Sequence, residues 1–84
     1  MTRDELKEIE TRCLGARPSP WISYVEGRDH FGGSHFIMVG EGENRSDDIE
    51  LPGATVADQD FIAAARQDVP RLVAEVRRLQ AMLK

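Results

Sequence analysis

The chain has little cysteine and no long apolar segment. Its single cysteine, Cys13, has no partner for an internal disulfide bond. No apolar run approaches the ~18 residues that a membrane-spanning helix needs, so we expect no membrane partner. The first five residues, Met-Thr-Arg-Asp-Glu, lack the apolar segment of a secretion signal. Together these absences predict a cytoplasmic protein.

Aromatic side chains are also scarce, at 6% of only 84 residues. By the scaling of surface with mass, a chain of this size exposes roughly 5,000 Å² when folded and about 13,600 Å² when extended, so about 63% of its surface can be buried. That leaves room for a single domain, residues 1–84, with a marginal core. The apolar content of 40% is nevertheless too high for a disordered tail. We therefore expect a folded domain that gains stability from self-association.

Negative charge is concentrated in the middle of the chain. Residues 21–60 carry two basic and nine acidic side chains, whereas residues 61–84 carry five basic and two acidic ones. General nucleic-acid binding needs a continuous footprint of Lys and Arg, which the acidic middle interrupts. The basic C-terminal part can instead face the acidic middle, within one chain or between copies, or hold a small anion.

The first residues predict a short N-terminal helix. Thr2 and Glu5 have the spacing of a capping box, in which each side chain accepts a hydrogen bond from the other residue's backbone N–H. Gly15 is placed to end this helical part, residues 1–16. The prolines of Arg17-Pro18-Ser19-Pro20 then exclude regular structure and steer the chain into an extended segment.

The β-rich part, residues 21–53, predicts a small antiparallel sheet of about three strands. Residues 21–26 and 34–39 are rich in β-branched and aromatic side chains, and we expect them to pair. Gly32-Gly33 can form a tight turn between them, although the polar residues before it can equally belong to a longer loop. Residues 49–51 predict the third strand. With the flanking helices, this sheet gives an α+β fold.

A helical pattern dominates the last part, residues 55–84, where Thr55 and Asp58 are suited to cap the start. Apolar or small residues recur there at steps of three and four, which makes one seam that can pack against another helix. Pro70 removes a backbone hydrogen bond, so we expect a kink or break, giving a kinked helix or a helix pair. The residues of this predicted interface are Ile62, Ala65, Val69, Leu72, Val76, Leu79 and Leu83.

Two uses of this seam remain open. It can pack on the protein's own sheet, or it can meet a partner helix, including that of a second copy of the chain. Because so small a body can hide little apolar surface, we expect a homo-oligomer.

The chain offers few groups for catalysis or metal binding. His30, His35 and Cys13 are the candidates for a nucleophile or a metal ligand, and a zinc site needs three or four ligands that converge. No spacing indicates a nucleophile elbow, a phosphate loop or a pair of catalytic carboxylates. We therefore expect no enzymatic activity, no metal and no cofactor.

A site for a small anion is easier to build from these residues. Aromatic faces can stack a base, and guanidinium groups can hold a phosphate through two parallel hydrogen bonds. The alternative is that Trp21 anchors the core and that Arg71 and Arg78 form ion pairs with Glu75 on the helix. The predicted ligand-binding residues are Trp21, Arg28, His35, Arg66, Arg71, Arg77 and Arg78.

Both ends of the chain resemble a known family. Residues 61–79, Phe-Ile-Ala-Ala-Ala-Arg-Gln-Asp-Val-Pro-Arg-Leu-Val-Ala-Glu-Val-Arg-Arg-Leu, and the segment Arg17-Pro18-Ser19-Pro20-Trp21 are similar to the Ead-like family of small phage and prophage proteins. Where that family usually has Thr and Gly in the turn before the tryptophan, this chain has Arg17 and Ser19. The resemblance covers roughly residues 5–21 and 54–83. It implies a phage-encoded accessory protein in a bacterial host cell, with no enzymatic activity.

The functional expectation combines these observations. We expect a non-catalytic oligomer that sequesters a small anionic nucleotide-type immune signal, in the manner of anti-defence sponges. The alternative is a protein-interaction module that binds a host or phage protein through the helical seam or the edge of the hairpin.

Overall fold

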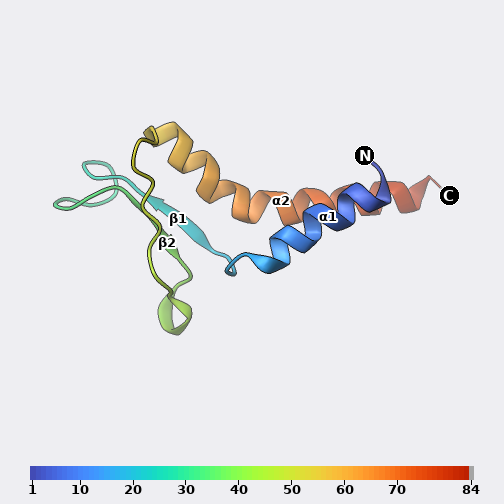
Figure 1. Cartoon of the computed structure of the whole chain (residues 1–84), viewed down its shortest axis with the longest axis horizontal. Coiled ribbons are helices and arrows are strands. Elements are labelled where there is room, and N and C mark those ends of the chain that lie inside the picture. The colour runs from blue at the N-terminus through green and yellow to red at the C-terminus, as the bar shows by residue number, and fades with distance from the viewer. Residues whose placement is uncertain (84) are drawn as a thin grey trace.

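The computed structural model describes residues 1–83 and has the α+β architecture that the sequence predicts. Helix α1 (Arg3–Gly15) leads into strand β1 (Trp21–Tyr24), which pairs with strand β2 (Phe36–Val39). A short 3-10 helix, η1 (Gly42–Asn44), and an extended loop then lead to the long helix α2 (Val56–Met82), as Figure 1 shows.

Both helices begin with a capping box, which the sequence predicted for Thr2 and Glu5. For the second helix Thr55 and Asp58 were predicted only as caps of a helix opening at Asp58 to Phe61, and the helix begins earlier, at Val56. In α1 the Thr2 backbone N–H donates to Glu5 Oε1 at 2.8 Å, and the Glu5 N–H donates to Thr2 Oγ1 at 3.1 Å. In α2 the Thr55 N–H donates to Asp58 Oδ2 at 3.1 Å, and the Asp58 N–H donates to Thr55 Oγ1 at 3.0 Å. These bonds satisfy backbone donors that would otherwise have no partner in the first turn, and so they fix where each helix starts.

The predicted pairing of the two strands is confirmed, but the predicted third strand is wrong. The strands are antiparallel, with Trp21 opposite Val39 and Tyr24 opposite Phe36. Ile49 makes only an isolated bridge, in which its N–H and C=O bond to Ile37 at 2.9 and 2.8 Å. The polar residues before Ile49 stay in solvent and Pro52 follows closely, so pairing does not extend beyond this one residue.

The connection between the strands is the longer loop rather than a two-residue turn. Residues 25–35 form it, and Gly32 and Gly33 both have positive φ angles, 79° and 111°. Val25 turns the chain back: its carbonyl accepts from the N–H groups of Arg28 and Asp29, and its own N–H donates to Asp29 Oδ2 at 2.8 Å. A tight local turn over residues 25–29, with Gly27 at a φ of 87°, therefore forms before Gly32 and Gly33 are reached, and β1 ends at Tyr24.

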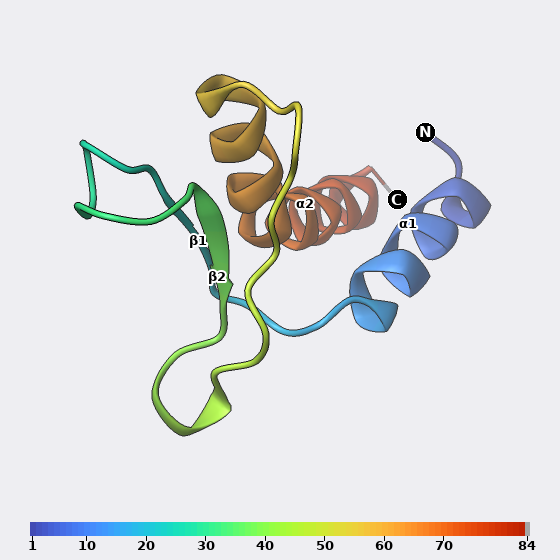
Figure 2. The same cartoon turned by 60° about the vertical axis from the view of Figure 1, so that its left-hand side comes forward.

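Pro70 bends α2 without dividing it. The helix is continuous over 27 residues with Pro70 inside it, so the prediction of a kink is confirmed and a helix pair is excluded. Figures 1 and 2 both show the axis changing direction in the orange part of the ribbon. The missing N–H and the bulk of the ring at Pro70 explain this bend.

The bend lets one helix cover two different partners. The first half of α2 packs on the sheet, and the second half packs on α1, which runs antiparallel to it so that both termini lie at the same end (Figure 1). Ile37, Val39 and Ala63 form the core between the sheet and α2, with Trp21, Ile49 and Leu51 packed around them. Leu6 is 1% exposed although α1 packs on no element other than α2 within residues 1–83.

The protein is elongated and has a large surface for its mass. Its principal extents are 54 × 28 × 18 Å, and its radius of gyration is 15.5 Å, whereas a compact domain of this length has a radius of gyration of about 12 Å. The accessible surface is 6143 Å², against roughly 5,000 Å² for a compact monomer of this mass. Within residues 1–83 no helix is long and apolar enough to cross a bilayer.

Candidate functional site

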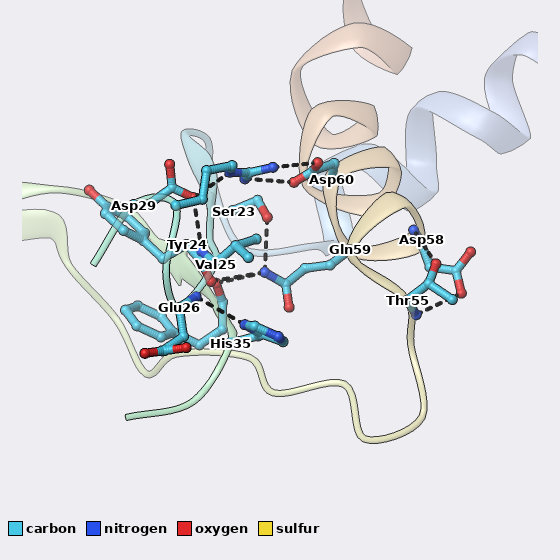
Figure 3. A network of polar contacts seen from close by, with 12 residues as sticks. Ser23, Tyr24, Val25, Glu26, Asp29, His35, Thr55, Asp58, Gln59 and Asp60 are labelled. Carbon is cyan, nitrogen blue, oxygen red and sulfur yellow. Dashed lines mark hydrogen bonds and ion pairs between the residues drawn. The ribbon is translucent and has the colours of Figure 1, made fainter. Parts of the chain in front are cut away.

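A buried glutamine joins α2 to the hairpin. Gln59 is 4% exposed, and its Nε2 donates to Ser23 Oγ at 2.9 Å, the Tyr24 carbonyl at 3.1 Å and the Phe36 carbonyl at 3.2 Å (Figure 3). Burying an amide is costly unless it is hydrogen-bonded, and these three acceptors lie on both strands. Gln59 thereby sets the position of α2 on the sheet.

Arg28 is held by carboxylates beside this glutamine. Its two terminal nitrogens donate to Asp60 Oδ2 and Oδ1 at 2.8 and 3.0 Å, and its Nε donates to Asp29 Oδ2 at 2.9 Å (Figure 3). The Arg28 guanidinium, helped by a hydrogen bond from Ser23, lowers the pKa of Asp60 to about 2. The predicted ligand residue Arg28 thus ties the loop to the start of α2 with its own donors.

The two histidines lie in the same loop region and have different surroundings. His35 is exposed, and its Nδ1 accepts from the Glu26 N–H at 3.0 Å. His30 packs against the rings of Tyr24 and Phe36, which stack on each other with centroids 5.3 Å apart. In the part of the chain that the structure describes, no three His, Cys, Asp or Glu side chains are grouped to hold a metal ion.

Trp21 and Arg66, both predicted ligand residues, meet at one carbonyl oxygen. Arg66 Nε donates to the Arg17 carbonyl at 2.9 Å, and Trp21 Nε1 donates to the same oxygen at 3.2 Å. The Gln67 side chain also bonds to the Trp21 backbone, accepting from its N–H at 2.8 Å and donating to its C=O at 3.2 Å. Trp21 is half-buried against the core, so the structure gives it the role of an anchor.

Two of the three remaining predicted arginines are in ion pairs. Arg77 on α2 donates to Glu10 Oε1 of α1 at 3.2 Å. Arg78 donates from Nε to Glu75 Oε2 at 3.0 Å, and this guanidinium lowers the pKa of Glu75. Arg71 has no ion-pair partner among residues 1–83.

These arginines do not converge within one chain. Arg28 pairs with Asp60 at the first turns of α2, whereas Arg77 lies near the other end of that helix. Seventeen residues separate Asp60 from Arg77, which is about 25 Å along a helix. A single small ligand cannot contact both ends.

The predicted apolar seam is largely uncovered. The buried positions of α2 are Gln59, Ala63 and Val73. Ala63 and Val73 each follow a seam position by one residue, which is a rotation of about 100° around the helix, and Gln59 lies three residues before Ile62. The sheet and α1 cover the face of α2 next to the predicted seam. The prediction therefore identified a helix face that adjoins the intrachain contact. Leu72 is 62% exposed, Leu79 47% and Ile62 40%. Leu83 is exposed, and Ala65, Val69 and Val76 are half-buried.

A shallow hollow lies on this open face of α2. It has a volume of about 500 Å³ and is lined by Asp68, Arg71, Leu72 and Glu75, close to the bend at Pro70. Its lining combines an apolar side chain with charges of both signs. Such a surface suits contact with another protein surface of mixed character better than it suits a small anion, because two carboxylates flank the one unpaired guanidinium.

Comparison with known proteins identifies no relative: no protein-family model, no curated protein and no solved structure matches the chain. The inference about its function therefore depends on its own residues.

The sequence analysis did not predict Gln59, Gln67 and Asp60, which position the hairpin on α2. The sequence indicates these residues only weakly, because an apolar periodicity does not include polar side chains that lie on a buried helix face.

Proposed function

We propose that this protein is a non-catalytic interaction protein that self-associates through the open face of α2, defined here by Ile62, Ala65, Leu72, Leu79 and Leu83. The single observation that carries the proposal is the exposure of Leu72 and Leu79 on one face of a helix whose adjacent face is fully used within the chain. Leu72, Leu79 and Leu83 are the most exposed members of that face, and Ala65 is half-buried.

The size of the surface supports the same proposal. The chain exposes 6143 Å², roughly 1,100 Å² more than a compact monomer of its mass. A standard interface buries about 800 Å² on each partner. Covering one face of α2 with a second copy would therefore remove most of this excess accessible surface. A twofold-symmetric contact needs only one patch on each chain, because the same patch of both copies meets.

Substituting Leu72 tests this proposal. Wild type should have about twice the 9.4 kDa mass of one chain in light scattering, and Leu72→Asp should run as a single chain. An unpaired carboxylate in a dry contact costs several kcal/mol per ion, so the dissociation constant should rise at least ~100-fold. Ala74→Asp introduces the same group at an exposed position on the opposite side of α2 and should leave the dimer intact. A wild type of single-chain mass at every concentration would contradict the proposal.

The resemblance to Ead-like proteins gives this proposal a biological setting. We place the protein among phage or prophage accessory proteins of the bacterial cytoplasm. The alternative partner is a host or phage protein that binds the same face, and it predicts a monomeric wild type that becomes a mixed complex when that partner is added.

Sequestration of a nucleotide-type signal is a second proposal, favoured by the junction of Trp21 and Arg66. An indole and a guanidinium share the Arg17 carbonyl there, and the terminal nitrogens of Arg66 have no bond to another residue of the described chain. Arg66 also lines a pocket of about 200 Å³ between α1 and α2. The Arg66 guanidinium suits phosphate contact, and Trp21 helps to fix the Arg17 carbonyl that holds it.

A thermal-shift screen with cyclic dinucleotides and cyclic ADP-ribose isomers tests sequestration. A ligand at 100 times its dissociation constant adds about 2.7 kcal/mol and should raise the melting temperature by on the order of 10 °C. Arg66→Gln should abolish the shift, whereas Arg12→Gln on the exposed side of α1 should retain it. An unchanged melting temperature with every compound would remove the sequestration proposal.

A further inference from the structure

An apolar groove lies where the start of α2 meets the loop before it. Phe61 is 67% exposed and Ile62 40% exposed, and together with Leu51 they line a groove of about 430 Å³. The groove adjoins the open face of α2 at Ile62 and extends across to residues 50–54. Aromatic side chains are enriched in protein interfaces, so an exposed phenylalanine beside a groove indicates a surface for a protein partner.

The two walls of this groove are held by bonds within the chain. The Ala54 N–H donates to the Leu51 carbonyl at 3.0 Å, across Pro52 and Gly53. Gly53 has a φ of 88°, so these four residues have the pattern of a type II turn, with proline second and glycine third. The capping box at Thr55 fixes the start of the helical wall. A partner would therefore lose little affinity to ordering the groove.

The rim of the groove carries two carboxylates that form no ion pair within residues 1–83. Glu50 accepts a hydrogen bond from Ser34 Oγ at 3.3 Å, and Asp58 accepts one from the Thr55 N–H at 3.1 Å, but no Arg, Lys or His in that range pairs with either. Residues 41–58, which lead into and form the groove, carry six acidic side chains and one basic side chain. This charge attracts a cationic partner and repels phosphate.

The acidic rim narrows the class of occupant. A twofold axis through the groove would bring Glu50 and Asp58 of one copy against the same residues of the other, so a symmetric contact between copies is disfavoured here. Leu72 and Leu79, which carry the proposed self-association, do not line the groove. Nucleic acid is disfavoured as well, because its phosphates need Lys and Arg. The complementary occupant is a protein segment with Lys or Arg beside leucine-like side chains.

We propose that this groove binds a basic, apolar segment of a partner protein. An apolar side chain of the segment lies against Phe61 and Ile62, and a Lys or Arg of the segment faces Glu50 and Asp58 at the rim. The interaction goes beyond self-association and does not depend on it, because the residues at the centre of each surface differ.

Two model peptides test the chemistry of the occupant. One is an amphipathic Leu/Lys peptide of about four helical turns, and the other has Glu at every Lys position. In a titration followed by amide chemical shifts, the Leu/Lys peptide should shift the amides of Leu51, Ala54 and Ile62 first, with a dissociation constant of about 100 µM. The Leu/Glu peptide should bind at least ~10-fold more weakly, because its carboxylates meet those of the rim.

Matched substitutions test the residues of the groove. Phe61→Ala should raise the dissociation constant for the Leu/Lys peptide about tenfold, whereas Phe31→Ala, which removes an 86% exposed phenylalanine from another loop, should leave it unchanged. Glu50→Lys should raise the constant about tenfold, whereas Glu43→Lys makes the same change of charge at an exposed position of η1 and should alter it less than about twofold. Helix content by circular dichroism should be equal in all these proteins.

Three results would overturn the groove proposal. They are equal binding of the two peptides, shifts centred on Leu72 and Leu79 in place of the groove, and equal effects of Glu50→Lys and Glu43→Lys, which would reduce the binding to general attraction by an acidic chain. Absence of any shift at millimolar peptide would overturn it as well. Light scattering without peptide reports self-association separately, so failure of either proposal is recognised without the other.

Discussion

Replacing Ile37 by alanine should lower the free energy of unfolding by about 2–5 kcal/mol. Ile37 is 0% exposed, lies at the centre of the core with Val39 and Ala63, and is bracketed by β1 on one side and Ile49 on the other. Its backbone is hydrogen-bonded to Ile49 on that side, so the surrounding chain has little freedom to close the cavity. For 84 residues the whole stability amounts to about 4–13 kcal/mol, so this single change removes a large share of it.

Urea denaturation monitored by circular dichroism measures the effect. Phe31→Ala is the control, because the Phe31 side chain is 86% exposed and its removal should change stability by less than about 0.5 kcal/mol. An Ile37→Ala protein as stable as Phe31→Ala would show that the core is not centred on the contact between the sheet and α2.

Replacing Leu6 by alanine should release α1 from α2. Leu6 is the buried apolar residue of α1, at 1% exposure, and the other bonds across this contact, Arg77 to Glu10 and Gln80 to the Met1 carbonyl, are exposed. Exposed ion pairs contribute about 0–1 kcal/mol each, whereas truncating a buried leucine costs about 2–5 kcal/mol. The contact should therefore fail locally before the rest of the protein unfolds.

Hydrogen exchange distinguishes this local release from global unfolding. Amides of α1 should lose protection in Leu6→Ala, while the amide of Ile37 on β2, which donates to the Ile49 carbonyl at 2.8 Å, should keep its protection. Leu14→Ala removes the same atoms from a side chain of α1 that is 81% exposed, and it should behave as wild type. Unchanged protection of α1 in Leu6→Ala would mean that the helix is held mainly by its polar contacts.

The parts of the fold that were predictable are those with local causes. Thr2 with Glu5 predicted the start of α1, because a capping box needs only residues three apart, whereas α2 begins at Val56, two residues before the predicted start. The bend at Pro70 likewise follows from the chemistry of one residue. The third strand was predicted wrongly because the composition of residues 49–51 favours extension, but pairing depends on where the loop before them leads.

The site was less predictable, because ion pairing depends on tertiary contacts. Arg28 and Arg77 are indistinguishable from ligand-binding arginines in the sequence, and their partners Asp60 and Glu10 lie 32 and 67 residues away. The buried face of α2 also includes the polar Gln59, which apolar periodicity does not count. The sequence therefore predicted the seam as one face of the helix. Its exposure depends on the neighbouring face, which packs on the sheet and on α1, and the sequence pattern does not show that packing.

The most direct test of the account is a search for intermolecular nuclear Overhauser effects in a sample that mixes isotope-labelled and unlabelled chains. The account predicts effects between copies at the methyl groups of Leu72 and Leu79, which one chain leaves exposed. Methyl groups of Ile37 and Val39 should show contacts within their own chain alone. An absence of intermolecular effects at Leu72 and Leu79, in a sample concentrated enough to detect them, would contradict the claim that a second copy covers the open face of α2.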